Sequence, residues 1–108
     1  MAQQYFTREE AETLLPWLGE QLATLRDLTL KQSQLEGELQ GLLRRARGDG
    51  GASLEEEIEG KRRALETAVR DLQERAQAIA NEGIILRDLE RGLVDFPSQR
   101  EGREIYLC

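Results

Sequence analysis

Carboxylates are the side chains of this 108-residue chain whose types and spacing could do chemistry. Glu9 with Glu12 and Glu56 with Glu59 are paired acids of the kind used in metal-assisted hydrolysis. Helices of this composition supply such pairs by chance, however. We therefore predict no catalytic residue, and we expect the protein not to be an enzyme.

A run of acids could also hold a divalent cation, since carboxylate oxygens suit magnesium or calcium. The run consists of Glu55, Glu56, Glu57 and Glu59. Acids in the first turn of a helix also complement its dipole, and this is the interpretation that we prefer. We accordingly expect no metal ion and no cofactor.

Composition excludes several other functions. Nucleophilic catalysis needs a base beside the nucleophile, and the chain has no histidine and one cysteine, Cys108. One cysteine forms no internal disulfide and no zinc site, which favours the cytoplasm. The net charge of -6 has the wrong sign for binding nucleic acid. The sequence has no long uncharged apolar run, so no membrane segment is predicted.

Two leucine-rich stripes with heptad spacing predict the helices that carry these residues. The first helix is expected over residues 8–46, beginning at a capping box formed by Thr7 and Glu10. Phe6, just before the cap, is placed to pack onto Ala11. Pro16 lies well inside the pattern and should kink or break this helix.

The second helix is expected over residues 54–82, with a capping box at Ser53 and a left-handed Gly83 closing its end. Residues 47–52 form the connector, and folding about Gly50 gives an antiparallel coiled coil. The expected core pairs are Leu42 with Ile58, Leu35 with Leu65, Leu28 with Leu72, and Leu22 with Ile79. Gln32 falls in this seam, where it could fix the register or, as we prefer, reach water at the edge.

Small residues on the helices are the predicted interface. Each helix-interior glycine costs about 0.5 to 1 kcal/mol relative to alanine, so glycines there need an explanation. A partner backbone could approach them closely, or a marginal surface could simply tolerate them. The predicted interface residues are Gly37, Gly41, Gly60, Ala64, Ala68, Ala76 and Ala80.

The last quarter of the chain changes from helical to strand-like spacing. Short strands are expected within residues 84–108, at 84–86, 93–96 and 103–108. We expect this sheet to cover the start of the first helix, at Leu14, Leu15, Trp17 and Leu18. The predicted fold is one α+β domain over residues 1–108: a long antiparallel helical hairpin with a small antiparallel sheet at its base.

Motifs at both ends of the chain resemble a known family. They are Tyr5-Phe6-Thr7-Arg8-Glu9-Glu10-Ala11 with Leu14-Leu15-Pro16 at the front, and Asp88, Gly92-Leu93-Val94-Asp95-Phe96-Pro97, Gly102-Arg103-Glu104 and Tyr106-Leu107-Cys108 at the back. Together they resemble the uncharacterised bacterial domain-of-unknown-function family 2203. The resemblance implies no activity, and it implies a further C-terminal segment carrying Trp-His beyond the position of Cys108.

Three functions compete at this point. A lone two-helix hairpin leaves apolar surface exposed, which favours an interaction module, with a homodimeric four-helix bundle as the expected form. A second alternative is a factor whose hairpin tip binds a larger machine such as RNA polymerase, by analogy of fold with transcription-cleavage factors. A third is metal-dependent activity that needs the C-terminal segment implied by the resemblance.

Overall fold

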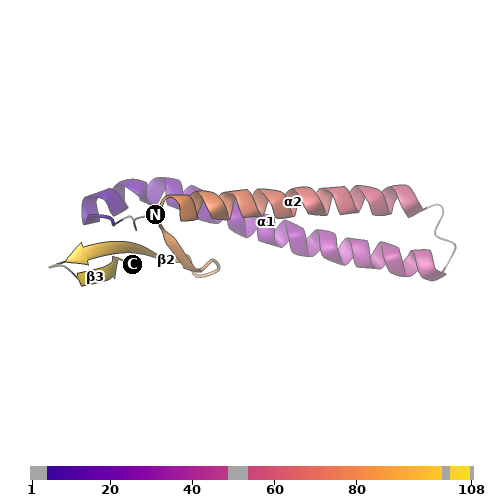
Figure 1. The fold of residues 1–108 in the computed structure, drawn as a ribbon. Helices are drawn as coiled ribbons and strands as arrows, with labels where there is room; N and C mark the ends of the chain where they lie inside the picture. The colour runs from indigo at the N-terminus through magenta and orange to yellow at the C-terminus, as the bar shows by residue number, and fades with distance from the viewer. Residues whose placement is uncertain (1–4, 49–53, 101–102, 108) are drawn as a thin grey trace. The chain divides into compact units, whose positions relative to one another are not determined.

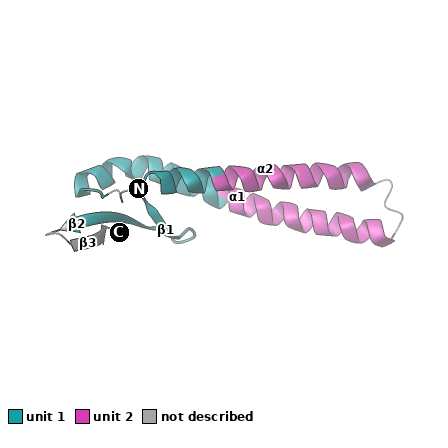
Figure 2. Ribbon diagram, in the orientation of Figure 1, with its two compact units in different colours: residues 1–26, 74–108 teal, residues 27–73 magenta. Residues whose placement is uncertain are grey.

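The computed structural model describes residues 5–48, 54–100 and 103–107. Its elements, in order, are α1 (Arg8–Gly48), α2 (Glu55–Asn81), β1 (Ile85–Asp88), β2 (Leu93–Arg100) and β3 (Arg103–Leu107), as Figure 1 shows. The predicted α+β class, a helical hairpin with a small C-terminal sheet, is confirmed. The chain divides into two compact units, coloured separately in Figure 2: unit 1 is residues 1–26 with 74–108, and unit 2 is residues 27–73.

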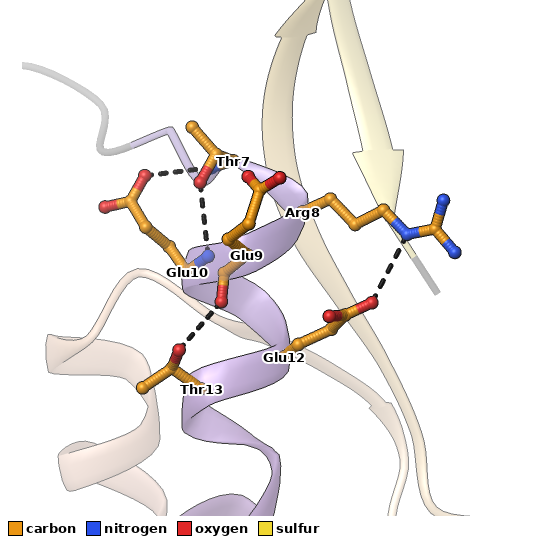
Figure 3. A network of polar contacts seen from close by, with 6 residues as sticks. All are labelled: Thr7, Arg8, Glu9, Glu10, Glu12 and Thr13. Atoms are coloured by element: carbon orange, nitrogen blue, oxygen red, sulfur yellow. Dashed lines mark hydrogen bonds and ion pairs between the residues drawn. The ribbon is translucent and has the colours of Figure 1, made fainter.

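The predicted capping box starts α1. The Glu10 amide donates to the Thr7 hydroxyl oxygen at 3.1 Å, and the Thr7 amide donates to the Glu10 carboxylate at 3.0 Å (Figure 3). These two bonds satisfy backbone donors that have no partner within the helix. The cap therefore fixes where α1 begins, one residue after Thr7.

Pro16 does not break α1, which continues through it without interruption to Gly48. The proline ring removes one amide donor and crowds the carbonyl of Glu12, four residues earlier. The helical turns on either side hold the segment in helical conformation all the same. The kink expected at Pro16 stays a prediction.

In unit 2 the two helices lie side by side and run in opposite directions (Figure 2). Their buried side chains are Leu35 and Leu42 of α1 with Ile58 and Ala68 of α2. An ion pair between Lys61 and Glu38 bridges the two helices. The predicted reversal of the chain between the helices is thus present, while the connector with Gly50 and Ser53 lies outside the described residues.

The end of α2 is closed as the sequence predicted. Gly83 has a φ of 86°, the left-handed conformation that glycine adopts without strain. Its amide donates to the Ala80 carbonyl at 2.9 Å, and the Ile84 amide donates to the Ile79 carbonyl at 3.4 Å. This pair of bonds is the Schellman motif, which satisfies the last carbonyls of a helix and turns the chain away.

The sheet has three antiparallel strands in the order β1-β2-β3. Ile85 pairs with Asp95 in the first ladder and Ser98 with Ile105 in the second. The strand β2 runs through Pro97, where the sequence pattern predicted its end, and β1 starts one residue later than expected. Pro97 instead provides a carbonyl that accepts from the Phe6 amide at 2.7 Å, tying the N-terminal segment to the sheet.

The core of unit 1 contains side chains of the sheet and of the start of α1, but the sheet does not cover Leu15 as predicted. Phe6 meets Phe96 of β2 edge to face, with ring centroids 5.3 Å apart. Leu18 is 2% exposed, whereas Leu15 remains 51% exposed. Phe6 thus has a long-range partner, Phe96 of the sheet, that the local helix signal did not indicate. Its packing onto Ala11 stays a prediction.

Candidate functional site

A groove at the connector end of unit 2 is the candidate interaction site. It has a volume of about 580 Å³ and lies between the last turns of α1 and the first turns of α2. We call it the hairpin groove, and its lining residues are Glu38, Gly41, Leu42, Arg44, Arg45, Glu57 and Lys61. Sequence reasoning named only Gly41 of these as an interface residue, because helical spacing shows a stripe but not a concavity.

The glycines of unit 2 have open space where a side chain would stand. A Cβ atom built on Gly37, Gly41 or Gly60 would meet no other atom within 4 Å, apart from the local helix backbone and chain neighbours. The internal packing of the described chain therefore does not require glycine at these three positions. Gly37 and Gly60 are exposed, and Gly41 is half-buried in the hairpin groove.

The predicted interface alanines lie in different environments. Ala68 is 2% exposed and belongs to the core of the hairpin, so its side chain does not face outward. Ala64 is half-buried in unit 2. Ala76 is half-buried and Ala80 is exposed, and both belong to unit 1. Among the predicted residues of unit 2, four therefore remain accessible to a partner: Gly37, Gly41, Gly60 and Ala64.

Two basic side chains of α2 reach across to α1 rather than along their own helix. Charge spacing alone pairs Lys61 with Glu57, but Lys61 forms its ion pair with Glu38. In unit 1, the Arg75 guanidinium donates to the Gln21 side-chain oxygen at 3.3 Å, and Gln21 is only 8% exposed. The sequence pattern did not indicate this buried amide.

Both bases belong to one set of α2 positions with heptad spacing. The positions Leu54, Ile58, Lys61, Leu65, Ala68, Leu72, Arg75 and Ile79 alternate steps of four and three, and they include both cross-helix bases. The spacing of the leucines also allows a neighbouring stripe that passes through Arg62 and Val69 instead. Arg62 is exposed and Val69 half-buried, whereas Ala68 is buried. The contact between the two helices therefore includes polar side chains as well as leucines.

Gln32 lies at the edge of the seam between the helices, which is the interpretation that we preferred. It is half-buried, and its amide donates to the Glu36 carboxylate at 3.0 Å on the same helix. This bond is exposed and joins residues four apart, so it belongs to the edge of the seam.

One member of each carboxylate pair forms an ion pair with an arginine on its own helix. Glu12 pairs with Arg8 at 3.3 Å, as Figure 3 shows, and Glu59 pairs with Arg63 at 3.5 Å. Both are exposed pairs four residues apart on one helix, typical of a solvated face. Within residues 5–48, 54–100 and 103–107, no three acidic, histidine or cysteine side chains gather as metal ligands would.

A second groove lies within unit 1, between α1 and the sheet. Its volume is about 340 Å³, and its lining is mainly apolar. The lining residues are Leu15, Leu18, Gly19, Leu22, Arg87, Gly92, Leu93, Val94, Asp95 and Phe96. The Arg87 guanidinium and the Asp95 carboxylate, 2.7 Å apart, form an ion pair in this lining.

The molecule is thus a helical-hairpin protein with a small antiparallel sheet, whose grooves lie beside helix-interior glycines. A family model matches residues 4–108, and the chain belongs to that family, the uncharacterised conserved proteins designated DUF2203. No curated protein and no solved structure matches the chain. Neither described helix contains a stretch long and apolar enough to cross a membrane.

Proposed function

We propose that this protein is a cytoplasmic interaction module that self-associates through its helical hairpin. The observation that carries the proposal is the open space at Gly37, Gly41 and Gly60. Each glycine weakens its helix, and the surrounding chain gains nothing from it. Close approach of a second helix would give these positions a use, because a helix without side chains on one face lets another backbone come near.

Partly exposed leucines support the same proposal. Leu30 is 60% exposed, and the flanks of the hairpin core remain half-buried in the single chain. The half-buried leucines of unit 2 are Leu28, Leu39, Leu43, Leu54, Leu65 and Leu72. Two helices cannot cover both sides of an apolar seam, whereas four helices can. Burial of this surface supplies the driving force for a dimer.

Sedimentation analysis of the chain at micromolar concentration tests the proposal, with a dimer as the expected result. The informative variant is Gly41→Gln, which adds a long polar side chain to the hairpin groove and should reduce dimerisation. The matched control is Gly19→Gln, because Gly19 is also in the interior of α1 with nothing within 4 Å, but belongs to unit 1. A wild-type chain that sediments as a monomer throughout this range contradicts the proposal.

A further inference from the structure

The two helix ends beside the hairpin groove carry opposite charges. Arg44, Arg45 and Arg47 are exposed on the last turns of α1, and Glu55, Glu56 and Glu57 are exposed on the first turn of α2. Within the described part of the chain, none of these six side chains forms an ion pair, although the two sets lie at the same end of unit 2. The helix dipoles favour these signs in each chain, and the charged ends remain available to a partner.

The hairpin groove places members of both sets on one concave surface. Arg44 and Arg45 line it from α1, and Glu57 lines it from α2. Gly41, also on α1, adds open space to the lining. The only ion pair between these two helices in the described chain, Lys61 with Glu38, already neutralises the remaining two charges of the lining. The groove therefore presents a basic edge on one helix and an acidic edge on the other.

A surface with these two edges is complementary to itself in one orientation. A two-fold axis along the hairpin stacks two copies face to face, with α1 of each copy over α2 of the other and both connectors at the same end. The basic edge then faces the partner's acidic edge twice. A two-fold axis across the helices would place α1 over α1, so that edges of like sign face each other where the connector ends overlap.

We infer that a second copy of this chain docks in the hairpin groove in the first orientation, so that Arg44 and Arg45 of each copy face Glu57 of the other. This inference rests on the proposed self-association, and it adds the relative orientation of the two copies and the residues that face each other. Charge complementarity at an interface sets orientation, and an interface between identical copies repeats each contact twice.

Charge reversal tests the pairing. An acidic variant, R44E/R45E, and a basic variant, E57K, should each form the homodimer about tenfold more weakly or worse at low salt. An equimolar mixture of the two should form a heterodimer with nearly the wild-type affinity, because every facing pair is again of opposite sign. Glu55 and Glu56 are left unchanged because they do not line the groove. Sedimentation analysis measures all three species, and circular dichroism checks that each variant is helical.

The mixture also distinguishes two explanations for a weaker homodimer: lost contacts between chains, and misfolding of one chain by internal charge repulsion. A variant that fails to fold would not form a heterodimer, because its partner does not repair its fold. If each reversed variant dimerises like the wild type, or the mixture forms no heterodimer, the inference is overturned while the proposed self-association stands. A wild-type monomer would overturn both.

The matched controls are R62E/R70E and E66K, which make the same changes in net charge at exposed positions of α2 that do not line the groove. Each control should dimerise like the wild type, within about twofold, because exposed charges away from the contact contribute little. Controls that behave like the groove variants would show a general charge effect and overturn the inference.

Discussion

At the scale of single residues, glycines in the described part of the chain differ in whether their position requires glycine. Gly92 has a φ of 67°, and a Cβ atom there would lie 2.8 Å from the Arg26 guanidinium. The same guanidinium group donates, through Nε, to the Leu89 carbonyl at 3.1 Å. Gly92 is therefore required by the turn between β1 and β2, unlike the helix-interior glycines.

We predict that Gly92→Ala destabilises the fold by roughly 1 to 3 kcal/mol, because it combines left-handed backbone strain with displacement of Arg26. Urea denaturation followed by circular dichroism measures the change. Gly19→Ala is the control, and it should stabilise the chain by about 0.5 to 1 kcal/mol, since its Cβ meets nothing and Gly19 lies outside the proposed interface. A Gly92→Ala variant as stable as the wild type would contradict the turn geometry.

At the scale of elements, local signals predicted most of the helices. The cap at Thr7, the closure at Gly83 and the heptad leucines each depend on residues a few positions apart, and α1 and α2 have ends within two residues of those predicted. The course of β2 beyond Pro97 was missed. Its extension depends on pairing with β3, a contact that no local pattern contains.

The start of α1 supplies a matched pair of substitutions. Thr7→Ala should destabilise the chain by about 1 kcal/mol, because it removes the hydroxyl that accepts from the Glu10 amide. Thr13→Ala is the control, since the Thr13 hydroxyl only donates to the Glu9 carbonyl within the helix, at 2.8 Å (Figure 3). Thermal unfolding compares the two, and equal effects would mean that the capping bonds contribute nothing.

At the scale of the whole molecule, the sequence predicted one residue of the hairpin groove and not the groove itself. Helical spacing identified Gly41 but not Arg44, Arg45 or Glu38, because a groove depends on how two helices face each other. The pattern also placed Ala68 outside the core, one heptad phase away from its buried position. Registers of this kind are set by contacts between helices, which a single stripe cannot show.

The proposed dimer makes thermal stability depend on concentration. A folded chain that binds a second copy is stabilised by mass action, by about 2.7 kcal/mol at a hundredfold excess over the dissociation constant. For a chain of this size we expect the midpoint of unfolding to rise by roughly 10 °C over that range. Calorimetry or circular dichroism over a hundredfold range of concentration measures this rise, and a constant midpoint would contradict association.

Gly41→Gln should change the sign of its effect with concentration. Glutamine stabilises a helix by about 0.5 kcal/mol relative to glycine, so the variant should unfold at a higher temperature than the wild type where both are monomeric. At high concentration the wild type should be the more stable, because the added side chain occupies the groove that the partner needs. The two melting curves, plotted against concentration, should therefore cross. Parallel curves would show that Gly41 affects only its own helix and has no part in association.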